Sequence, residues 1–257
     1  MTVDEIVKHT FCDVWNDTLK KYKINPTASQ VFPRGYVLGG QPGAGKSYLS
    51  ELANEKCYKN IVIINADDFR KYHPNYKEYQ IQYGKDSPKY TSEYSGKMAE
   101  EILNKAMLSR FNVVIEGTFR TSETPIKTLS KMKDNGYNTE VMIQTCSKEL
   151  SWKSCQERYV AMKKIDEITG ANEARWTDKA HHDLVCENLA KNIKTVYESG
   201  FADKVEVFSR YENGKNELIY SSEKDGVPNV QKINKVLKFE TKENKVNRNN
   251  MGYEIER

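Results

Sequence analysis

The sequence predicts an α/β fold in which a mostly parallel central sheet lies between two layers of helices. The first observation is a set of short, β-branched apolar runs, which are typical of strands buried on both faces. The second is that helix-like stretches alternate with these runs, because parallel strands need crossover connections that are usually helical. The expected strands span residues 36–40, 60–64, 112–116, 139–145 and 204–208, and the expected helices span 47–57, 68–79, 92–109, 124–135, 148–165 and 177–198.

The two ends of the chain extend this pattern. Residues 3–22 carry apolar side chains near helical spacing, so we expect an amphipathic opening helix. After the last strand, an Asn213-Gly214 turn between two short strand candidates predicts a hairpin at the sheet edge. A length of 257 residues is compatible with one large domain. We therefore expect a single domain over residues 1–225 and a tail over residues 226–257 that is partly helical and partly flexible.

Composition and charge argue against several classes of protein. Hydrophobic residues make up 38% of the chain and charged residues 30%, which suits a globular protein with a heavily charged surface. The balance of 40 Lys and Arg against 36 Asp and Glu does not indicate nucleic-acid binding. No apolar run suits a membrane span, the opening lacks a signal-peptide pattern, and the five cysteines form no CxxC pair. We expect a cytoplasmic protein with neither a membrane nor a nucleic-acid partner.

One motif carries most of the chemical information. Directly after the first expected strand, the chain matches the phosphate-loop pattern GxxxxGK[ST] and then continues into an expected helix. Such a loop turns backbone N–H groups toward a phosphate, while its lysine reaches the outer phosphates and its hydroxyl can bind Mg²⁺. The fold is therefore expected to be of the P-loop NTPase or kinase type, with ATP and Mg²⁺ held by Gly40, Gln41, Pro42, Gly43, Ala44, Gly45, Lys46 and Ser47.

The residues that follow the second strand suggest an acceptor site. Ligands of open α/β sheets lie beyond the carboxyl ends of the strands, and Asp67 and Asp68 stand there. A carboxylate in that position can accept the proton of a hydroxyl that attacks the γ-phosphate, so Asp67 is a candidate base. The alternative is that Asp67 or Asp68 caps the next helix, and one of the two acids can cap while the other reacts.

The third strand is followed by a second polar cluster. Glu116, Thr118 and Arg120 bring an acid, a hydroxyl and a base to the edge where the sheet meets the cleft. Glu116 is a candidate to hold Mg²⁺ through water or to grip a substrate hydroxyl. The chain has no hydrophobic run ending in Asp-Glu, which argues against motor ATPases, and no NKxD motif, which argues against a GTPase.

Two later arginines flank a helix break. Arg158 and Arg175 stand on either side of the segment TGAN at residues 169–172, which is a candidate lid. A transferring phosphoryl group needs positive charge beyond one lysine and one metal ion, so a lid arginine suits this chemistry. The alternative for each arginine is a solvated helix face.

Taken together, the motifs resemble those of the zeta toxin family of bacterial toxin–antitoxin systems. The resemblance covers about residues 36–185, and D-x-F-x-x-x-H-P-N with EGT-x-R-T-x-x-x-P is its most specific part. The matching segments, in order, are LGGQPGAGKS, NIVIINADDFRKYHPNYKEY, YGKDSPKYTSEYSGKMAEEI, NVVIEGTFRTSETPIKT, QERY and EARWTDKAHHD.

The resemblance implies a kinase that uses ATP and Mg²⁺ to phosphorylate the 3′-hydroxyl of the amino sugar in UDP-N-acetylglucosamine, which blocks peptidoglycan precursor synthesis. It also implies a small helical antitoxin as partner, placed over the ATP cleft. By motif, Asp67 matches the base, Lys46 and Ser47 handle phosphates and metal, and Arg158 and Arg175 face ATP. The substrate-binding set is Asp67, Glu100, Glu116, Thr118, Arg120 and Thr128.

Two other interpretations stay open from the residues alone. The same cleft would serve a phosphate-loop kinase for another small hydroxyl compound, such as an antibiotic-modifying phosphotransferase. It would also serve a nucleotide-gated binding module in which hydrolysis only switches shape.

Overall fold

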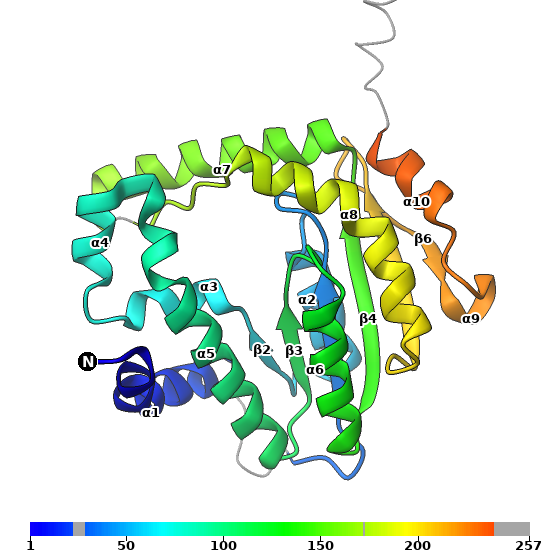
Figure 1. Ribbon diagram of the computed structural model, residues 1–257, viewed down its shortest axis with the longest axis horizontal. Coiled ribbons are helices and arrows are strands. Elements are labelled where there is room, and N and C mark those ends of the chain that lie inside the picture. Colours follow the sequence, from blue (N-terminus) through cyan, green and yellow to red (C-terminus); the bar gives the residue numbers. More distant parts are fainter. Residues whose placement is uncertain (23–28, 172, 239–257) are drawn as a thin grey trace, which may run out of the picture.

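The computed structural model describes residues 1–22, 29–171 and 173–238 and contains a six-stranded sheet of order β2-β3-β1-β4-β5-β6. The first five strands are parallel to their neighbours, and β6 pairs antiparallel with β5. This confirms the predicted α/β sandwich and the edge hairpin (Figure 1). The strands are β1 (Arg34–Gly39), β2 (Val62–Ile64), β3 (Val113–Glu116), β4 (Asn138–Thr145), β5 (Lys204–Arg210) and β6 (Asn216–Ser221).

Helices cover both faces of the sheet because successive strand residues point to opposite sides. Tyr36 and Leu38 of β1 pack in one cluster with Leu49 and Ala53 of α2, whereas Val37 joins the larger cluster on the other face, to which α5, α6 and α8 contribute. The helices are α1 (Val3–Tyr22), α2 (Ser47–Lys56), α3 (Ala66–Phe69), α4 (Tyr76–Tyr83), α5 (Ser87–Leu108), α6 (Glu123–Asp134), α7 (Lys148–Thr169), α8 (Lys179–Glu198), α9 (Ser222–Asp225) and α10 (Val230–Leu237).

One predicted helix is wrong. The continuous helix expected over residues 68–79 is divided into α3, a 3₁₀ turn at Arg70–Tyr72 and α4. The break falls at His73, whose ψ of 128° is extended. Pro74 explains it, because a proline ring disfavours helical backbone in the residue before it. The interruption leaves α3 as a short platform directly after β2.

The predicted tail is partly packed. Ile233 and Leu237 of α10 are buried in the same core cluster as residues of α8, so this helix contributes to the main body. The domain boundary at residue 225 stays a prediction, and residues 239–257 lie outside the described part of the chain. Among residues 1–22, 29–171 and 173–238, no helix is both long and apolar enough to cross a membrane.

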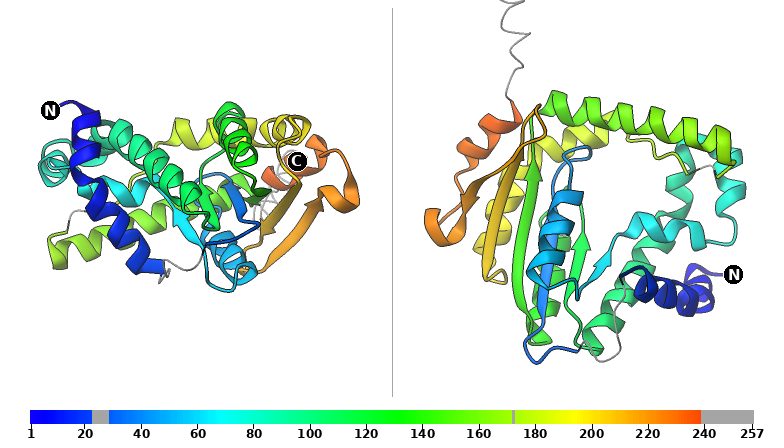
Figure 2. Two further views of the ribbon diagram at one scale, coloured as in Figure 1. Left: turned by 90° about the horizontal axis from the view of Figure 1, so that it is seen from below. Right: turned by 180° about the vertical axis from the view of Figure 1, so that it is seen from behind.

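Helix α7 lies above the carboxyl edge of the sheet (Figure 1). It starts beside the carboxyl end of β4 and runs across to the α4 region, in the view of Figure 1 and from behind in Figure 2. A cation–π contact closes the far end, where Lys85 Nζ lies 4.2 Å from the Trp176 ring centroid and 5.4 Å from that of Tyr159. The carboxyl edge of the sheet is thus enclosed by α7 above and by α3 to α5 at one side.

Candidate active site

The phosphate loop follows β1 and is tightly enclosed by backbone. Gly40, Gly43 and Gly45 have φ values of +136°, +79° and +94°, a backbone conformation that residues other than glycine rarely adopt. A Cβ at Gly40 would lie 2.0 Å from the carbonyl oxygen of Gln144, and one at Gly43 would lie 2.0 Å from that of Ser151. The glycines therefore permit both the turn of the loop and its contact with β4 and α7.

Lys46 and Ser47 close the loop. The Lys46 Nζ donates to the Gly40 carbonyl at 3.1 Å, so the side chain folds back over the loop it belongs to. Burial lowers the pKa of Lys46, whereas the nearby carboxylates of Glu116 and Asp67 favour its charged form. Ser47 is the first residue of α2 and is exposed, which places a hydroxyl at a helix N-terminus. The glycine-rich loop fits a nucleotide phosphate, and the Ser47 hydroxyl and the nearby carboxylates offer oxygen ligands that fit Mg²⁺.

The capping alternative for Asp67 and Asp68 is wrong. Asn65 is the N-cap of α3, and its side-chain oxygen accepts the Asp67 N–H at 3.0 Å. Asn is as good a cap as Asp, so neither carboxylate is needed for this task. The Asp67 side chain is 46% exposed and accepts a 2.8 Å hydrogen bond from Arg70 Nε. Its carboxylate is both oriented and accessible.

Arg70 ties this carboxylate to α5. Its Nη1 donates to the Pro88 carbonyl at 2.8 Å and to Thr91 Oγ1 at 3.0 Å, while its Nε holds Asp67. The guanidinium is a planar fork with donors in set directions, so these contacts together restrict where the Asp67 carboxylate lies. Sequence reasoning did not single out Arg70, although its position three residues after Asp67 is a spacing at which helical side chains meet.

Glu116 lies at the carboxyl end of β3 and joins two neighbouring elements. Its Oε1 accepts from Ser50 Oγ of α2 at 2.7 Å, and its Oε2 accepts from Asn65 Nδ2 at 3.0 Å. Asn65 therefore links Glu116 to the backbone of Asp67, so the two predicted carboxylates stand on one hydrogen-bonded framework. Ser50 and Asn65 are part of that framework and were not predicted.

The segment after Glu116 adopts an unusual backbone. Phe119 has φ of +56°, and its buried ring packs on Gly39, where a Cβ would lie 2.2 Å from Phe119 Cδ2. Asn192 of α8 donates to the carbonyls of Phe119 and Arg120, both at 2.9 Å. Left-handed backbone in a bulky residue costs free energy and is common at functional sites. Phe119 and Asn192 hold the segment that carries Thr118 and Arg120, and the sequence offered no signal for either role.

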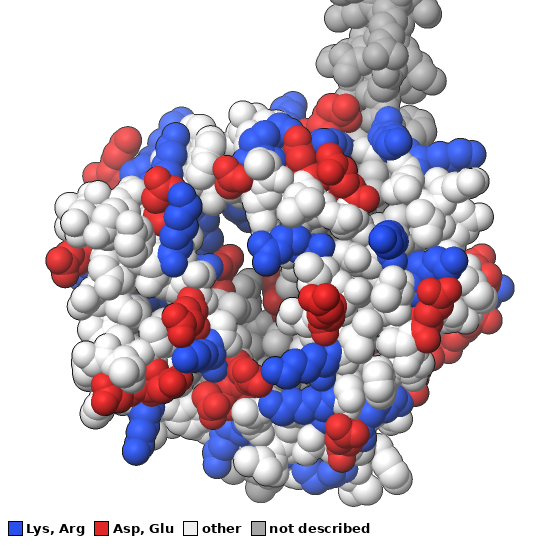
Figure 3. Space-filling model, in the orientation of Figure 1, with Lys and Arg blue, Asp and Glu red and all other residues white. Residues whose placement is uncertain are grey.

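Glu100 and Thr128 occupy the facing helices α5 and α6. The Glu100 Oε1 lies 3.5 Å from Lys131 Nζ and 3.8 Å from Lys127 Nζ, both on α6 beside Thr128. Within residues 1–22, 29–171 and 173–238, neither Glu100 nor Thr128 forms a hydrogen bond or ion pair with Asp67. The space-filling view shows this face hollowed at its centre, with charged side chains of both signs around the rim (Figure 3).

The two arginines on either side of the α7–α8 connection differ in their surroundings. Arg175 Nη2 donates to Asp68 Oδ1 at 3.0 Å, and its Nη1 lies 3.9 Å from Asp67 Oδ2. Arg158 is exposed on α7, and its Nη2 donates to Thr177 Oγ1 at 3.1 Å. The structure thus brings Arg175 to the predicted base, while Arg158 faces the same connection from α7.

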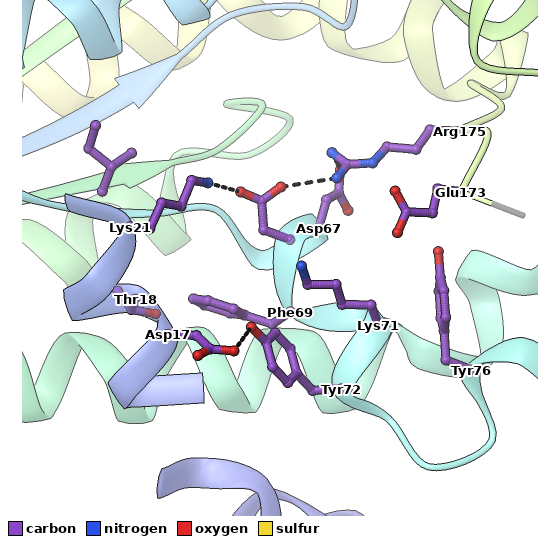
Figure 4. Close-up of a pocket in the computed structure, with 12 residues that line it drawn as sticks. Asp17, Thr18, Lys21, Asp67, Phe69, Lys71, Tyr72, Tyr76, Glu173 and Arg175 are labelled. Carbon is purple, nitrogen blue, oxygen red and sulfur yellow. Dashed lines mark hydrogen bonds and ion pairs between the residues drawn. The ribbon is translucent and has the colours of Figure 1, made fainter. Parts of the chain in front are cut away.

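Asp68 is the centre of an ion-pair cluster. Lys21 of α1 binds Asp68 Oδ2 at 3.0 Å, opposite the Arg175 contact. Burial alone would raise the pKa of Asp68, but the hydrogen bonds from Arg175 and Lys21 outweigh it and leave that pKa below its usual value. A cavity of about 250 Å³ adjoins the cluster between α1, α3 and the α7–α8 connection (Figure 4). Sequence reasoning missed Lys21, because an opening helix gives no sign of the element it faces.

The α7–α8 pair beside the loop is joined by a buried polar network. Ser151 Oγ lies 2.9 Å from His182 Nε2, and His182 Nδ1 lies 2.9 Å from Asp183 Oδ1. Ser151 and His182 are fully buried, so this Ser–His–Asp arrangement has no access to a substrate and serves packing. Burial lowers the pKa of His182. The network holds the start of α7, where the Ser151 carbonyl lies against Gly43.

A phosphate loop after β1, with Glu116 at the end of the neighbouring strand β3 and Asp67 after β2, one strand further out, defines the phosphate-loop kinase fold. The fold is shared with a chain of the PezAT chromosomal toxin–antitoxin system of Streptococcus pneumoniae, at a TM-score of 0.76 and 26% identity over 97% of this chain and 94% of that one. An AvrRxo1-ORF1:-ORF2 complex with ATP has a similar fold, with a TM-score of 0.60 at 14% identity, over 90% of this chain and 71% of that one.

Sequence comparisons give the family. Toxin PezT of Streptococcus pneumoniae serotype 4 is 38% identical over 178 residues, which is 69% of this chain and 69% of that protein. Toxin zeta of Streptococcus pyogenes is 34% identical over 195 residues, 76% of this chain and 66% of that protein. The zeta toxin family model matches residues 16–225. The chain belongs to the zeta toxin family, whose members are kinase toxins of toxin–antitoxin systems. This confirms the resemblance found in its motifs.

Proposed function

We propose that this chain transfers the γ-phosphate of ATP to the 3′-hydroxyl of the N-acetylglucosamine moiety of UDP-N-acetylglucosamine in the cytoplasm. The product would block peptidoglycan precursor synthesis. One observation carries the proposal. A complete phosphate loop and an accessible carboxylate, Asp67, both follow strands at the carboxyl edge of the sheet, and Asp67 shares a framework with Glu116 through Asn65. This is the pairing of donor and acceptor machinery that a kinase needs, in a member of a kinase toxin family.

The donor half acts through the loop Gly40–Ser47. Its N–H groups and the N-terminus of α2 receive phosphate oxygens, and Lys46 supplies the positive charge for the outer phosphates. Arg158 and Arg175 add positive charge that faces ATP from the α7 side. When bound, Mg²⁺ would neutralise charge on the phosphates. Ser47 would hold it, and Glu116 would either help to hold it or bind the substrate hydroxyl.

The acceptor half acts through side chains. Asp67 accepts the proton of the sugar hydroxyl as that oxygen attacks, and Arg70 keeps its carboxylate in place from Oδ1. Glu100, Glu116, Thr118, Arg120 and Thr128 bind and orient the sugar nucleotide. Orientation matters because phosphoryl transfer depends mainly on positioning and electrostatics.

A constitutively active kinase of an essential precursor would harm its own cell, so the proposal includes an inhibitor. Similar folds occur in the PezAT toxin–antitoxin system. We propose that a cognate helical antitoxin covers the ATP cleft of this chain. A nucleotide titration of the toxin alone and of the complex tests this point, and equal affinity in both would contradict occlusion.

The deciding experiment is an incubation of the purified chain with ATP, Mg²⁺ and a panel of UDP-sugars, followed by mass spectrometry. The expected result is one added phosphate on UDP-N-acetylglucosamine, lost in Lys46→Met and kept in Lys191→Met on the exposed face of α8. Phosphorylation of a different hydroxyl compound in a wider panel would favour a phosphotransferase for another small substrate. ATP hydrolysis without transfer to any acceptor would favour a nucleotide-gated binding module.

A further inference from the structure

The last residue of β5 reaches the phosphate loop from outside. Arg210 Nη2 donates to the Gly43 carbonyl at 2.8 Å, and its Nε donates to the Ala44 carbonyl at 3.0 Å. The same Nη2 also donates to Ser154 Oγ of α7 at 3.0 Å. A Cβ on Gly45 would lie 3.3 Å from Arg210 Cδ and Nε, so the arginine stem passes against the outer side of the loop. One guanidinium thus joins β5, the phosphate loop and α7.

The strand order makes this contact possible. β5 is separated from β1 by β4, and Arg210 spans the carboxyl end of β4, where its Nη2 lies 3.9 Å from Cys146 Sγ. Neither the phosphate-loop motif nor the proposed lid includes this arginine.

The direction of these bonds matters for the loop. A phosphate loop turns N–H groups toward its anion, so the carbonyls of the same peptide groups face away and need donors elsewhere. The Ala44 carbonyl and the Gly45 N–H belong to one peptide group, which is planar and trans. A donor that holds the carbonyl therefore also sets the direction of the N–H. The charged guanidinium also makes these bonds stronger than bonds between neutral groups.

We propose that Arg210 is a positioning residue for the nucleotide. Its fork holds the outward carbonyls of Gly43 and Ala44. The Gly43–Ala44 peptide is fixed from both sides, since the Ala44 N–H donates to the Gln41 carbonyl at 3.1 Å, and the contact with the Ala44 carbonyl presets the plane whose Gly45 N–H receives a phosphate. Arg210 acts through the loop and not on the reacting atoms. This inference rests on the proposed function, since it takes the loop to bind ATP.

The test compares two arginines that make the same kind of contact. Arg110 also clamps backbone carbonyls, with Nε donating to Gln30 at 3.0 Å and Nη2 donating to Val31 at 2.6 Å. It precedes β3 at the amino edge of the sheet, opposite the phosphate loop. Arg110→Met therefore measures what the loss of an arginine–carbonyl contact does to the protein away from the phosphate loop. Any further change in Arg210→Met is due to the contact with the loop.

The first readout is binding and kinetics. Arg210→Met should raise the Kd and KM for ATP by about 10- to 100-fold, because the two charge-assisted hydrogen bonds to the loop are lost. The KM for the acceptor should stay near that of the parent, and Arg110→Met should leave both KM values unchanged. Arg210→Lys should be intermediate, because an ammonium can hold one carbonyl but not both in a fork. Equal ATP affinity in Arg210→Met and the parent, or an equal loss in Arg110→Met, would overturn the proposal.

The second readout needs no nucleotide. Hydrogen exchange of the amides in residues 40–47 should be faster in Arg210→Lys than in the parent and Arg110→Lys, since the loop peptides lose part of their fixation. If the parent binds no ATP, the proposed function fails, while the exchange comparison still decides whether Arg210 fixes the loop. Unchanged exchange in Arg210→Lys would overturn the positioning role even if ATP binds.

Discussion

The two halves of the proposed site differ in what holds their residues in position, which is backbone packing in one half and side-chain contacts in the other. On the proposed donor side, backbone does most of the positioning. Gly40, Gly43 and Gly45 have positive φ, and the first two lie against the carbonyls of Gln144 and Ser151. On the acceptor side, side chains hold one another, as in the Arg70 contact with Asp67 and the pairs of Asp68 with Lys21 and Arg175.

This difference has a physical consequence. Backbone packed at van der Waals contact leaves no space for substitution, so changes on the donor side should cost both stability and binding. Partly exposed ion pairs contribute little to stability, so changes on the acceptor side should mainly alter chemistry. Substitutions on the acceptor side should therefore change activity without changing stability, whereas substitutions in the packed backbone of the donor side should lower both. Four substitutions test this contrast.

The largest effect is expected from Lys46→Met. The Lys46 charge is proposed to act on the outer phosphates, so its removal should lower phosphoryl transfer by about 10³-fold or more, since catalysis of this reaction depends mainly on positioning and electrostatic stabilisation. The steady-state rate with ATP and UDP-N-acetylglucosamine measures it, and Lys191→Met on the far part of α8 is the control. A rate within about tenfold of the parent, about 1.4 kcal/mol of barrier, would contradict the role.

Asp67→Asn separates chemistry from structure on the acceptor side. Asn keeps the shape and an acceptor for Arg70 but is no base, so transfer should fall by about 10²–10⁴-fold. The free energy of unfolding should change by less than about 1 kcal/mol, because Asn65 provides the cap of α3. Nucleotide affinity should stay close to that of the parent. All three quantities are measured on one preparation.

Asp68→Asn is the matched control. It is the neighbouring carboxylate and binds Lys21 and Arg175, so the change should disturb the α7–α8 connection and leave proton transfer largely intact. Near-normal transfer in Asp67→Asn together with a large loss in Asp68→Asn would move the base to Asp68.

Gly43→Ala tests the packed backbone of the donor side. Gly136→Ala is its control, because Gly136 also has positive φ, +74°, but a Cβ there meets nothing within 4 Å. Both variants carry the strain of a left-handed residue, about 1–2 kcal/mol. Gly43→Ala should lose a further ~1–3 kcal/mol in chemical denaturation, because its Cβ meets the Ser151 carbonyl. Equal losses in the two variants would show that the loop has room to move.

The smallest effect concerns pH and the network behind the loop. Burial lowers the pKa of His182 in the folded chain. Below about pH 6.5, the ordinary pKa of histidine, the His182 side chain is therefore protonated more readily in the unfolded chain than in the folded one. Stability should therefore fall as pH drops through that value, by at most about 1.4 kcal/mol per pH unit for this residue.

Denaturation of the parent and His182→Gln at pH 7.5 and 5.5 measures this contribution. The variant should show a smaller difference between the two pH values, though not zero, because burial also lowers the pKa of His73 and of His181. A difference as large as that of the parent would show that His182 does not control the acid sensitivity.

Local rules explain the features that could be predicted from the residues alone. The phosphate loop, the alternation of strands and helices, and the positions of Asp67 and Glu116 after their strands all follow from residues a few positions apart. Glycine conformation, strand periodicity and the helix start act over that range. Even the error over residues 68–79 was local, since Pro74 carries the signal for the break.

Which side chains meet is settled by packing over the whole chain. Asn65 donates to Glu116 from β2 to β3, Lys21 reaches Asp68 from α1, Asn192 holds the Phe119 segment, and Arg210 clamps the loop across β4. Each of these contacts depends on the sheet order β2-β3-β1-β4-β5-β6 and on how the helices pack over it. That order is the outcome of burying the apolar faces of all these elements together. The partner of a long polar side chain cannot be read from its neighbours in sequence.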